Sequence, residues 1–159
     1  MKIGVLGTGT IASAVVRGIA GDGHEITVSE RSASQSAALA TAFENVTVAD
    51  NQTVLDQSDV VFLGLMAEAA LEVLEGLRFR ADQQVISMMA GVSLEQLSAM
   101  ITPAQARAIV IPFPGIAEGG SPVFMLGDVD LVNQIFTSRN SVFETRDNAE
   151  LEAYQSAQA

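Results

Sequence analysis

The stretch Lys2-Ile3-Gly4-Val5-Leu6-Gly7-Thr8-Gly9-Thr10-Ile11-Ala12 decides the fold of this chain. A short apolar run is followed at once by a glycine turn, and a segment with helical spacing begins near Thr10. The turn fits the pattern Gly-x-Gly-x-x-Gly, except that Ala12 stands at the third glycine position. We therefore expect a strand, a tight turn and a helix whose first N–H groups face an anion.

Each small residue of this turn has a separate physical role. Gly7 allows the chain to leave the strand through a positive φ, which is costly for other residues. Gly9 leaves the backbone bare where a pyrophosphate approaches, and Ala12 permits close packing of the helix on the strand. An ordinary strand-to-helix turn without a ligand is the alternative, but a second strand at Ile26-Thr27-Val28 favours a dinucleotide site. The predicted cofactor-binding residues are Gly7, Thr8, Gly9, Thr10, Ile11 and Ala12.

The end of the second predicted strand bears on which dinucleotide binds. This strand, Glu25 to Ser29, runs into Glu30-Arg31-Ser32, at the distance from the glycine turn where the adenosine ribose lies. Glu30 suits the ribose diol of NAD, whereas Arg31 and the hydroxyls of Ser29 and Ser32 suit the 2′-phosphate of NADP. We expect NADP(H) to be slightly favoured over NAD(H). The alternative is a solvated turn in which Ser32 or Ser34 caps the next helix.

Composition narrows the possible functions. The 159 residues suit one α/β domain, and a formal charge of −11 disfavours nucleic acid and anionic membranes as partners. No cysteine is present, so disulfides, thiolate nucleophiles and cysteine-based metal sites are excluded. No signal or membrane segment is recognised, so we expect a cytoplasmic protein. The only histidine, His24, is interpreted as an exposed loop residue.

Apolar strands and amphipathic helices alternate along the chain, and the run at residues 59–65 is typical of a central parallel strand. The fold class expected is therefore α/β: a Rossmann-like, doubly wound, mostly parallel sheet with helices on both faces. We assign residues 1–145 to this dinucleotide-binding domain and residues 146–159 to a polar tail with little to bury. Strands are predicted at 2–6, 25–29, 45–48, 59–65, 84–88, 106–111, 122–126 and 141–144, and helices at 10–20, 34–43, 51–57, 67–77, from 93 onward and at 128–137.

Further candidate residues follow strands that end at the same edge as the glycine turn. Leu65 and Met66 follow the fourth strand and Ala90 and Gly91 the fifth, so we expect them beside the cofactor. The sixth strand stops at a loop rich in turn residues, the substrate-loop candidates Pro112, Phe113, Pro114 and Gly115. A rigid connection is the alternative for this loop. No catalytic residue and no metal site is identified, since only the hydroxyls of Ser87 and Ser121 and backbone groups stand at this edge.

The order of these motifs resembles the nucleotide-binding half of the pyrroline-5-carboxylate reductase family. The similar segments are residues 1–12, 28–32, 59–65, 86–93 and 111–120, which together extend over nearly the whole chain. The resemblance implies an NAD(P)H-dependent reductase that acts on a cyclic imine in proline biosynthesis. It also implies a second, helical domain that forms a dimer and completes the active site, and Tyr154 to Ala159 stand about where it would begin.

The sequence departs from this family at two places near the expected chemistry. Leu65-Met66-Ala67 replaces a valine–lysine–proline segment, and Phe113 replaces an asparagine of the proline loop. Two other interpretations therefore stay open: a nucleotide-binding module without catalysis, and a reductase that passes hydride between NADP and a flavin-like carrier. The latter would use the apolar Met66 and Phe113 as its binding wall.

Overall fold

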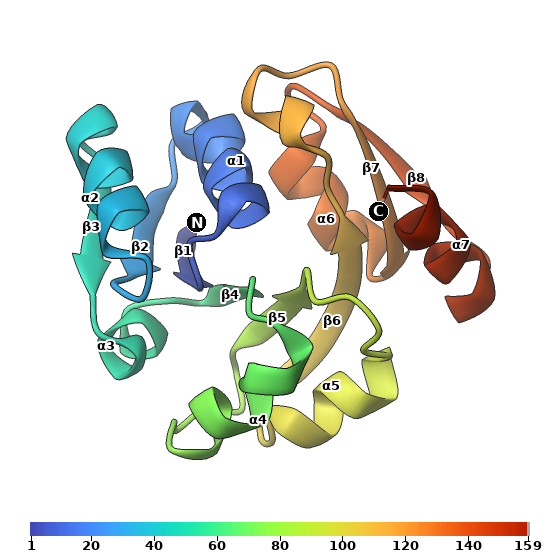
Figure 1. The fold of residues 1–159 in the computed structure, drawn as a ribbon, viewed down its shortest axis with the longest axis horizontal. Coiled ribbons are helices and arrows are strands. Elements are labelled where there is room, and N and C mark those ends of the chain that lie inside the picture. Colours follow the sequence, from blue (N-terminus) through green and yellow to red (C-terminus); the bar gives the residue numbers. More distant parts are fainter. Residues whose placement is uncertain (159) are drawn as a thin grey trace.

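The described part of the chain, residues 1–158 of the computed structural model, forms one sheet with the strand order β3-β2-β1-β4-β5-β6-β7-β8 (Figure 1). All neighbouring strands are parallel except β6 and β7. The end of the predicted tail, Ala159, lies outside the described residues. The strands are β1 (Lys2–Leu6), β2 (Glu25–Ser29), β3 (Val46–Ala49), β4 (Val60–Leu63), β5 (Gln84–Ser87), β6 (Gln105–Ile111), β7 (Pro122–Gly127) and β8 (Ser141–Glu144).

Helices cover both faces of this sheet, which confirms the Rossmann-like, mostly parallel fold class. One face carries α1 (Thr10–Ile19), α2 (Ala33–Ala42) and α6 (Val129–Phe136). The other carries α3 (Asn51–Asp56), α4 (Ala67–Glu75), α5 (Leu94–Met100) and α7 (Asn148–Gln158). Two short 3₁₀ helices, η1 (Ala20–Asp22) and η2 (Pro114–Ala117), complete the described elements. None of the described helices is long and apolar enough to cross a membrane.

The strands are apolar on both sides because each side faces a helix layer. In β4, Phe62 packs with the α1 and α6 layer, where its ring meets Phe136 edge-on at 5.9 Å. Its neighbours Val61 and Leu63 pack with the α3, α4 and α5 layer instead. All four residues of β4 are buried, as expected for a central parallel strand. This double burial fixes where each strand ends, and so fixes the edge that carries the site.

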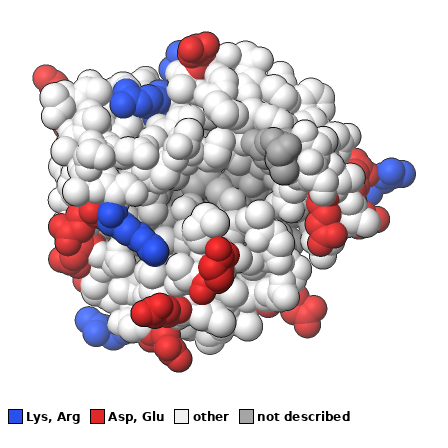
Figure 2. All heavy atoms as spheres, in the orientation of Figure 1, with Lys and Arg blue, Asp and Glu red and all other residues white. Residues whose placement is uncertain are grey.

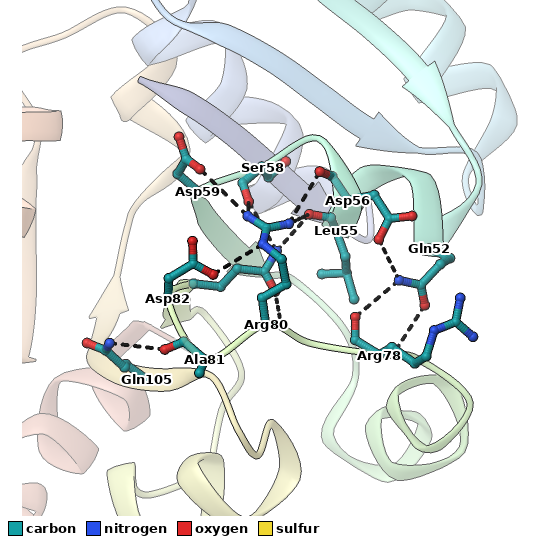
Figure 3. Close-up of polar contacts among 11 residues, drawn as sticks. Gln52, Leu55, Asp56, Ser58, Asp59, Arg78, Arg80, Ala81, Asp82 and Gln105 are labelled. Carbon is teal, nitrogen blue, oxygen red and sulfur yellow. Dashed lines mark hydrogen bonds and ion pairs between the residues drawn. The ribbon is translucent and has the colours of Figure 1, made fainter.

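The edge of the sheet at the amino ends of β4, β5 and β6 is tied together by polar contacts (Figure 3). The Arg80 guanidinium donates to the carbonyl oxygens of Leu55, Asp56 and Ser58, at 3.0 to 3.3 Å. It also pairs with Asp82 at 3.2 Å. The Gln105 amide donates to the carbonyl of Ala81, at the start of β6. These contacts hold the amino ends of these three strands together.

Two segments are buried differently from what the sequence suggests. The apolar Leu71, in the helix predicted at 67–77, is 63% exposed, because α4 packs mainly through Ala70 and Leu74. The polar tail was expected to bury little, yet residues 148–158 form α7, whose Leu151 is 3% exposed. Leu151 packs in one cluster with Ile109 and Ile111 of β6, and the partly buried Leu94, Phe124, Leu126 and Tyr154 pack against the same cluster.

His24 is also not the exposed loop residue that the sequence suggested. Its side chain is 8% exposed, and its Nδ1 accepts a hydrogen bond from the amino group of Met1 at 3.1 Å. Burial, and then the positive charge of that amino group, lower the pKa of His24, while Asp22 acts in the opposite direction. His24 precedes β2 and therefore lies at the edge opposite the candidate site.

Candidate functional site

The carboxyl ends of β1, β2, β4, β5 and β6 meet at one edge of the sheet, and cavities lie along it. The order of the strands reverses between β1 and β4, which is where α/β sheets of this type open a crevice. The central cavity runs from the glycine turn to the start of α4, and it shares Ile11, Met88 and Ala90 with a second cavity below the proline loop. A third cavity lies beyond β2. Figure 2 shows a hollow in this face with charged side chains gathered around it.

Gly7 has the conformation that the sequence predicted for it. Its φ is +89°, in the left-handed region that favours glycine. A Cβ at this position would also lie 2.7 Å from the carbonyl oxygen of Gly64, at the end of β4. Gly7 is therefore required by the turn itself, whether or not a ligand binds.

Gly9 is different, because nothing in the protein requires it to be a glycine. Its φ of −67° and ψ of −174° suit any residue, and an added Cβ would meet no atom within 4 Å. Gly9 precedes α1, and no side chain caps this helix. The first N–H groups of α1 therefore face the central cavity without a side-chain partner. An open glycine beside a free helix N-terminus is the arrangement that a pyrophosphate needs.

Ala12 replaces the third glycine of the pattern because a glycine faces it from β4. Ala12 is 3% exposed, and its Cβ lies 2.9 Å from the point where Gly64 would place a Cβ. Helix and strand can approach closely when one of the two contacting positions lacks a side chain. Gly64, the residue after β4, therefore lets α1 pack closely on the sheet although Ala12 carries a side chain.

A buried network of hydroxyl groups holds the glycine turn in place. Ser29 Oγ accepts a hydrogen bond from the backbone N–H of Gly7 at 2.8 Å. Ser36 Oγ donates its one proton to the carbonyl oxygen of Ser29 at 2.6 Å. Ser36 Oγ also lies 2.8 Å from Thr8 Oγ1, and in this second bond the Thr8 hydroxyl is therefore the donor. Ser13 Oγ lies 3.0 Å from the Thr8 carbonyl oxygen and completes the network. The predicted role of Ser29 as a phosphate ligand is wrong, since this side chain is fully buried.

The cavity beyond β2 combines one cation with several carboxylates. Glu30 and Arg31 line it, as expected for the adenosine end of a dinucleotide. Asp50 and Glu72 line the same cavity, and these two were not foreseen. Hydrogen bonds from the backbone and hydroxyl of Thr53 lower the pKa of Asp50, so its charge persists at neutral pH.

Ser32 follows Arg31 at the N-terminus of α2, but it is not among the residues that line this cavity. It occupies the N-cap position, but its side chain makes no capping hydrogen bond. The alternative interpretation of Ser32 as a helix cap is therefore wrong, and its hydroxyl stays available to a ligand beside Arg31.

Three of the four residues predicted after β4 and β5 line a cavity, and the fourth lies in an exposed turn. Leu65, Met66 and Ala90 line the central cavity, and Met66 is 65% exposed there. Gly91 forms the turn after β5 with a φ of +74° and lines neither cavity. Three of these four residues thus lie where the sequence placed them.

The proline loop contributes two of its four predicted residues to the second cavity. Pro112 and Pro114 line it together with the end of β6. The ring of Phe113 instead meets Phe124 of β7 edge-on at 5.9 Å, because the alternation of the chain turns it to the other side. Gly115 belongs to η2 and is not among the lining residues.

The hydroxyl candidates at this edge have structural roles. Ser87 is fully buried and accepts from the N–H of Met89 at 3.0 Å, and Ser121 is 6% exposed. Sequence reasoning missed Glu68, which lines the central cavity, and Gln155, which reaches the second cavity from α7. No group of acidic residues or histidines in the described part of the chain has the arrangement of a metal site.

Comparisons with known proteins agree with this geometry. Residues 2–91 match the family described as NADP oxidoreductase, coenzyme F420-dependent. Pyrroline-5-carboxylate reductase 3 of Xenopus laevis is 28% identical over 136 residues, which are 80% of this chain and 48% of that protein. The 1-pyrroline-5-carboxylate reductase of Streptococcus pyogenes superimposes with a TM-score of 0.79 at 28% identity, over 94% of this chain and 60% of that one.

A more distant structure shares the fold. The reductive aminase of Aspergillus terreus, in complex with NADPH and ethyl levulinate, gives a TM-score of 0.77 at 18% identity, over 98% of this chain and 59% of that one. The chain thus spans about half the length of the curated relative and about three fifths of these structures. The matched family region contains the glycine turn, the end of β2 and the turn after β5. The chain belongs to the family of NADP oxidoreductases described as coenzyme F420-dependent, and it corresponds to the N-terminal part of the pyrroline-5-carboxylate reductases that it resembles.

Proposed function

We propose that this chain forms the cofactor-binding part of an NAD(P)H-dependent reductase whose substrate is a cyclic imine or a related small C=N compound. The observation that carries the proposal is the central cavity. It joins an unhindered Gly9 and the uncapped start of α1 to an apolar cavity under the proline loop. The similarity to pyrroline-5-carboxylate reductases supports the choice of a C=N bond as the group reduced.

The residues present fit a dinucleotide along its whole length. The adenosine ribose would lie beside Glu30 and Arg31. The pyrophosphate would lie at Gly9 and the first N–H groups of α1, and the nicotinamide would lie toward Met88 and Ala90. A reduced nicotinamide supplies hydride to the imine carbon while the nitrogen takes up a proton, so that an amine and the oxidised cofactor result. The chain's own contribution is to hold the cofactor and to present a largely apolar wall to the substrate.

The direct test is turnover by the full-length protein with NADPH or NADH. Cyclic imines, with pyrroline-5-carboxylate first among them, should cause loss of the absorbance of the reduced nicotinamide and formation of the matching amine. Tight cofactor binding without oxidation by any imine would instead support a nucleotide-binding module without catalysis.

We further propose that NADP(H) is bound slightly more tightly than NAD(H). Arg31 and the free Ser32 hydroxyl favour a 2′-phosphate, whereas the carboxylates of Glu30, Asp50 and Glu72 oppose it. The NADPH bound by the reductive aminase of Aspergillus terreus is consistent with this preference. Because cation and carboxylates share one cavity, the difference in affinity is expected to be small.

The Arg31→Ala variant tests this preference. Loss of one charge-assisted contact at a solvent-exposed site should weaken NADPH binding by about tenfold, while NADH binding changes by less than about twofold. Arg17→Ala is the matched control, because Arg17 is an exposed arginine in the last turn of α1. Equal losses of affinity for NADPH and NADH, measured by calorimetry, would show that Arg31 does not bind the 2′-phosphate.

A second candidate substrate is a flavin-like carrier, as the description of the matched family mentions coenzyme F420. The wide apolar opening beside the exposed Met66 is the feature that favours it. The same assay with coenzyme F420 in place of an imine separates the two candidates. Phe113 does not contribute to this wall, contrary to expectation, since its ring packs against Phe124.

A further inference from the structure

The cavity under the proline loop has one polar side chain among the described residues that line it, the amide of Gln155. Its other walls are aliphatic or proline residues from α1, β6 and the two loops, and none of them carries a charge. The cavity has a volume of about 430 Å³, within the range of sites that bind small molecules. It adjoins the place where a nicotinamide would lie, since Met88 and Ala90 belong to both cavities.

Helix α7 holds Gln155 at this position through contacts on either side. Asp147 caps the helix by accepting from the N–H of Glu150 at 2.9 Å, which sets where α7 begins. Leu151 is buried against β6, and Gln155 lies one turn further on the same side of the helix. The ring of Tyr154 stacks on Phe124 of β7, with centroids 3.9 Å apart. These anchors fix the position of the Gln155 backbone over the cavity.

The Gln155 amide has no hydrogen-bond partner within the part of the chain that the structure describes. It is half-buried, and an amide at the mouth of an apolar cavity loses water when a ligand enters. A ligand that bonds to it therefore binds better than one that leaves it unpaired. The amide both donates and accepts, so it can pair with the nitrogen of an imine or of its protonated form.

We infer that Gln155 orients the substrate by a hydrogen bond to its C=N nitrogen. This inference rests on the proposed reductase function. Gln155 is thus a substrate-binding residue.

The test compares 1-pyrroline with pyrroline-5-carboxylate in the full-length wild-type protein and in the variants Gln155→Leu and Glu152→Leu. Glu152 is an exposed residue of the same helix and is the matched control. Both substrates present the same C=N group, so loss of the amide should affect both of them. Gln155→Leu should lower kcat/KM for 1-pyrroline by about three- to tenfold, mainly through KM, and should leave the Kd of the cofactor unchanged.

The outcomes separate the inference from the function on which it rests. Unchanged kinetics with both imines in Gln155→Leu would overturn the inference and leave the reductase intact. Equal losses in Gln155→Leu and Glu152→Leu would show that α7 acts only as a structural element. No cofactor oxidation with any imine would overturn the reductase and the assignment of Gln155 together.

Discussion

Replacing Gly9 by valine is expected to abolish binding of the nicotinamide dinucleotide and to leave the fold intact. The backbone at Gly9 suits valine, and an added Cβ meets no protein atom within 4 Å. The branched side chain would stand over the free N–H groups of α1, where the pyrophosphate lies in the proposed complex. We expect the Kd of NADPH to rise by roughly a hundredfold or more, about 3 kcal/mol, in calorimetry.

Gly76→Val is the matched control for this experiment. Gly76 also meets no atom within 4 Å of an added Cβ and has a negative φ, but it follows the C-terminus of α4, away from the cavities. The free energy of unfolding of both variants should lie within about 0.5 kcal/mol of the wild-type value, as is usual for surface substitutions. Binding of NADPH by Gly9→Val at wild-type affinity would contradict the placement of the pyrophosphate.

The elements that the sequence predicted best are those whose pattern is local. The bounds of β1 and β2 were predicted without error, because an apolar run is followed directly by turn residues in each case. The start of the helix predicted from 93 onward is also local, because Ser93 and Gln96 form a capping box with hydrogen bonds in both directions. Such signals depend on neighbours in the sequence, so they are readable without the structure.

The errors concern residues whose partners are distant in the sequence. Ser29 was expected to bind phosphate because of its place at the end of β2. Its hydroxyl instead accepts a hydrogen bond from the N–H of Gly7, which lies 22 positions earlier in the chain. Leu151 was assigned to a tail, because nothing in its surroundings in the sequence shows that it packs with Ile109 and Ile111 of β6. Gln155 was missed as a cavity residue for the same reason, since only the packing of α7 brings it there.

The glycine turn also shows how a departure from a pattern is understood only in three dimensions. Ala12 weakens the motif when the sequence is considered alone. The structure places Gly64 opposite Ala12, and Gly64 comes from another strand, more than fifty positions along the chain. A pattern that allowed the glycine either at the position of Ala12 or at the position of Gly64 would match this turn.

Replacing Gly18 by valine should strongly destabilise the fold and displace the proline loop. Gly18 is the point where η2 packs on α1, and an added Cβ would lie 2.5 Å from the carbonyl oxygen of Ile116. Backbone atoms cannot yield as a flexible side chain can, so helix and loop must separate. We expect a loss of about 3 kcal/mol in the free energy of unfolding. The midpoint of thermal unfolding should fall by about 6–12 °C.

The same variant should affect the second cavity more than the first, because η2 begins at Pro114, which lines only the second. At a temperature where the variant is folded, KM for an imine should therefore rise more than the Kd of NADPH. Gly21→Val is the control, since Gly21 lies just beyond α1 and an added Cβ there is unobstructed. If Gly18→Val matched this control in stability, the contact between α1 and η2 could not be what holds the proline loop over the cavity.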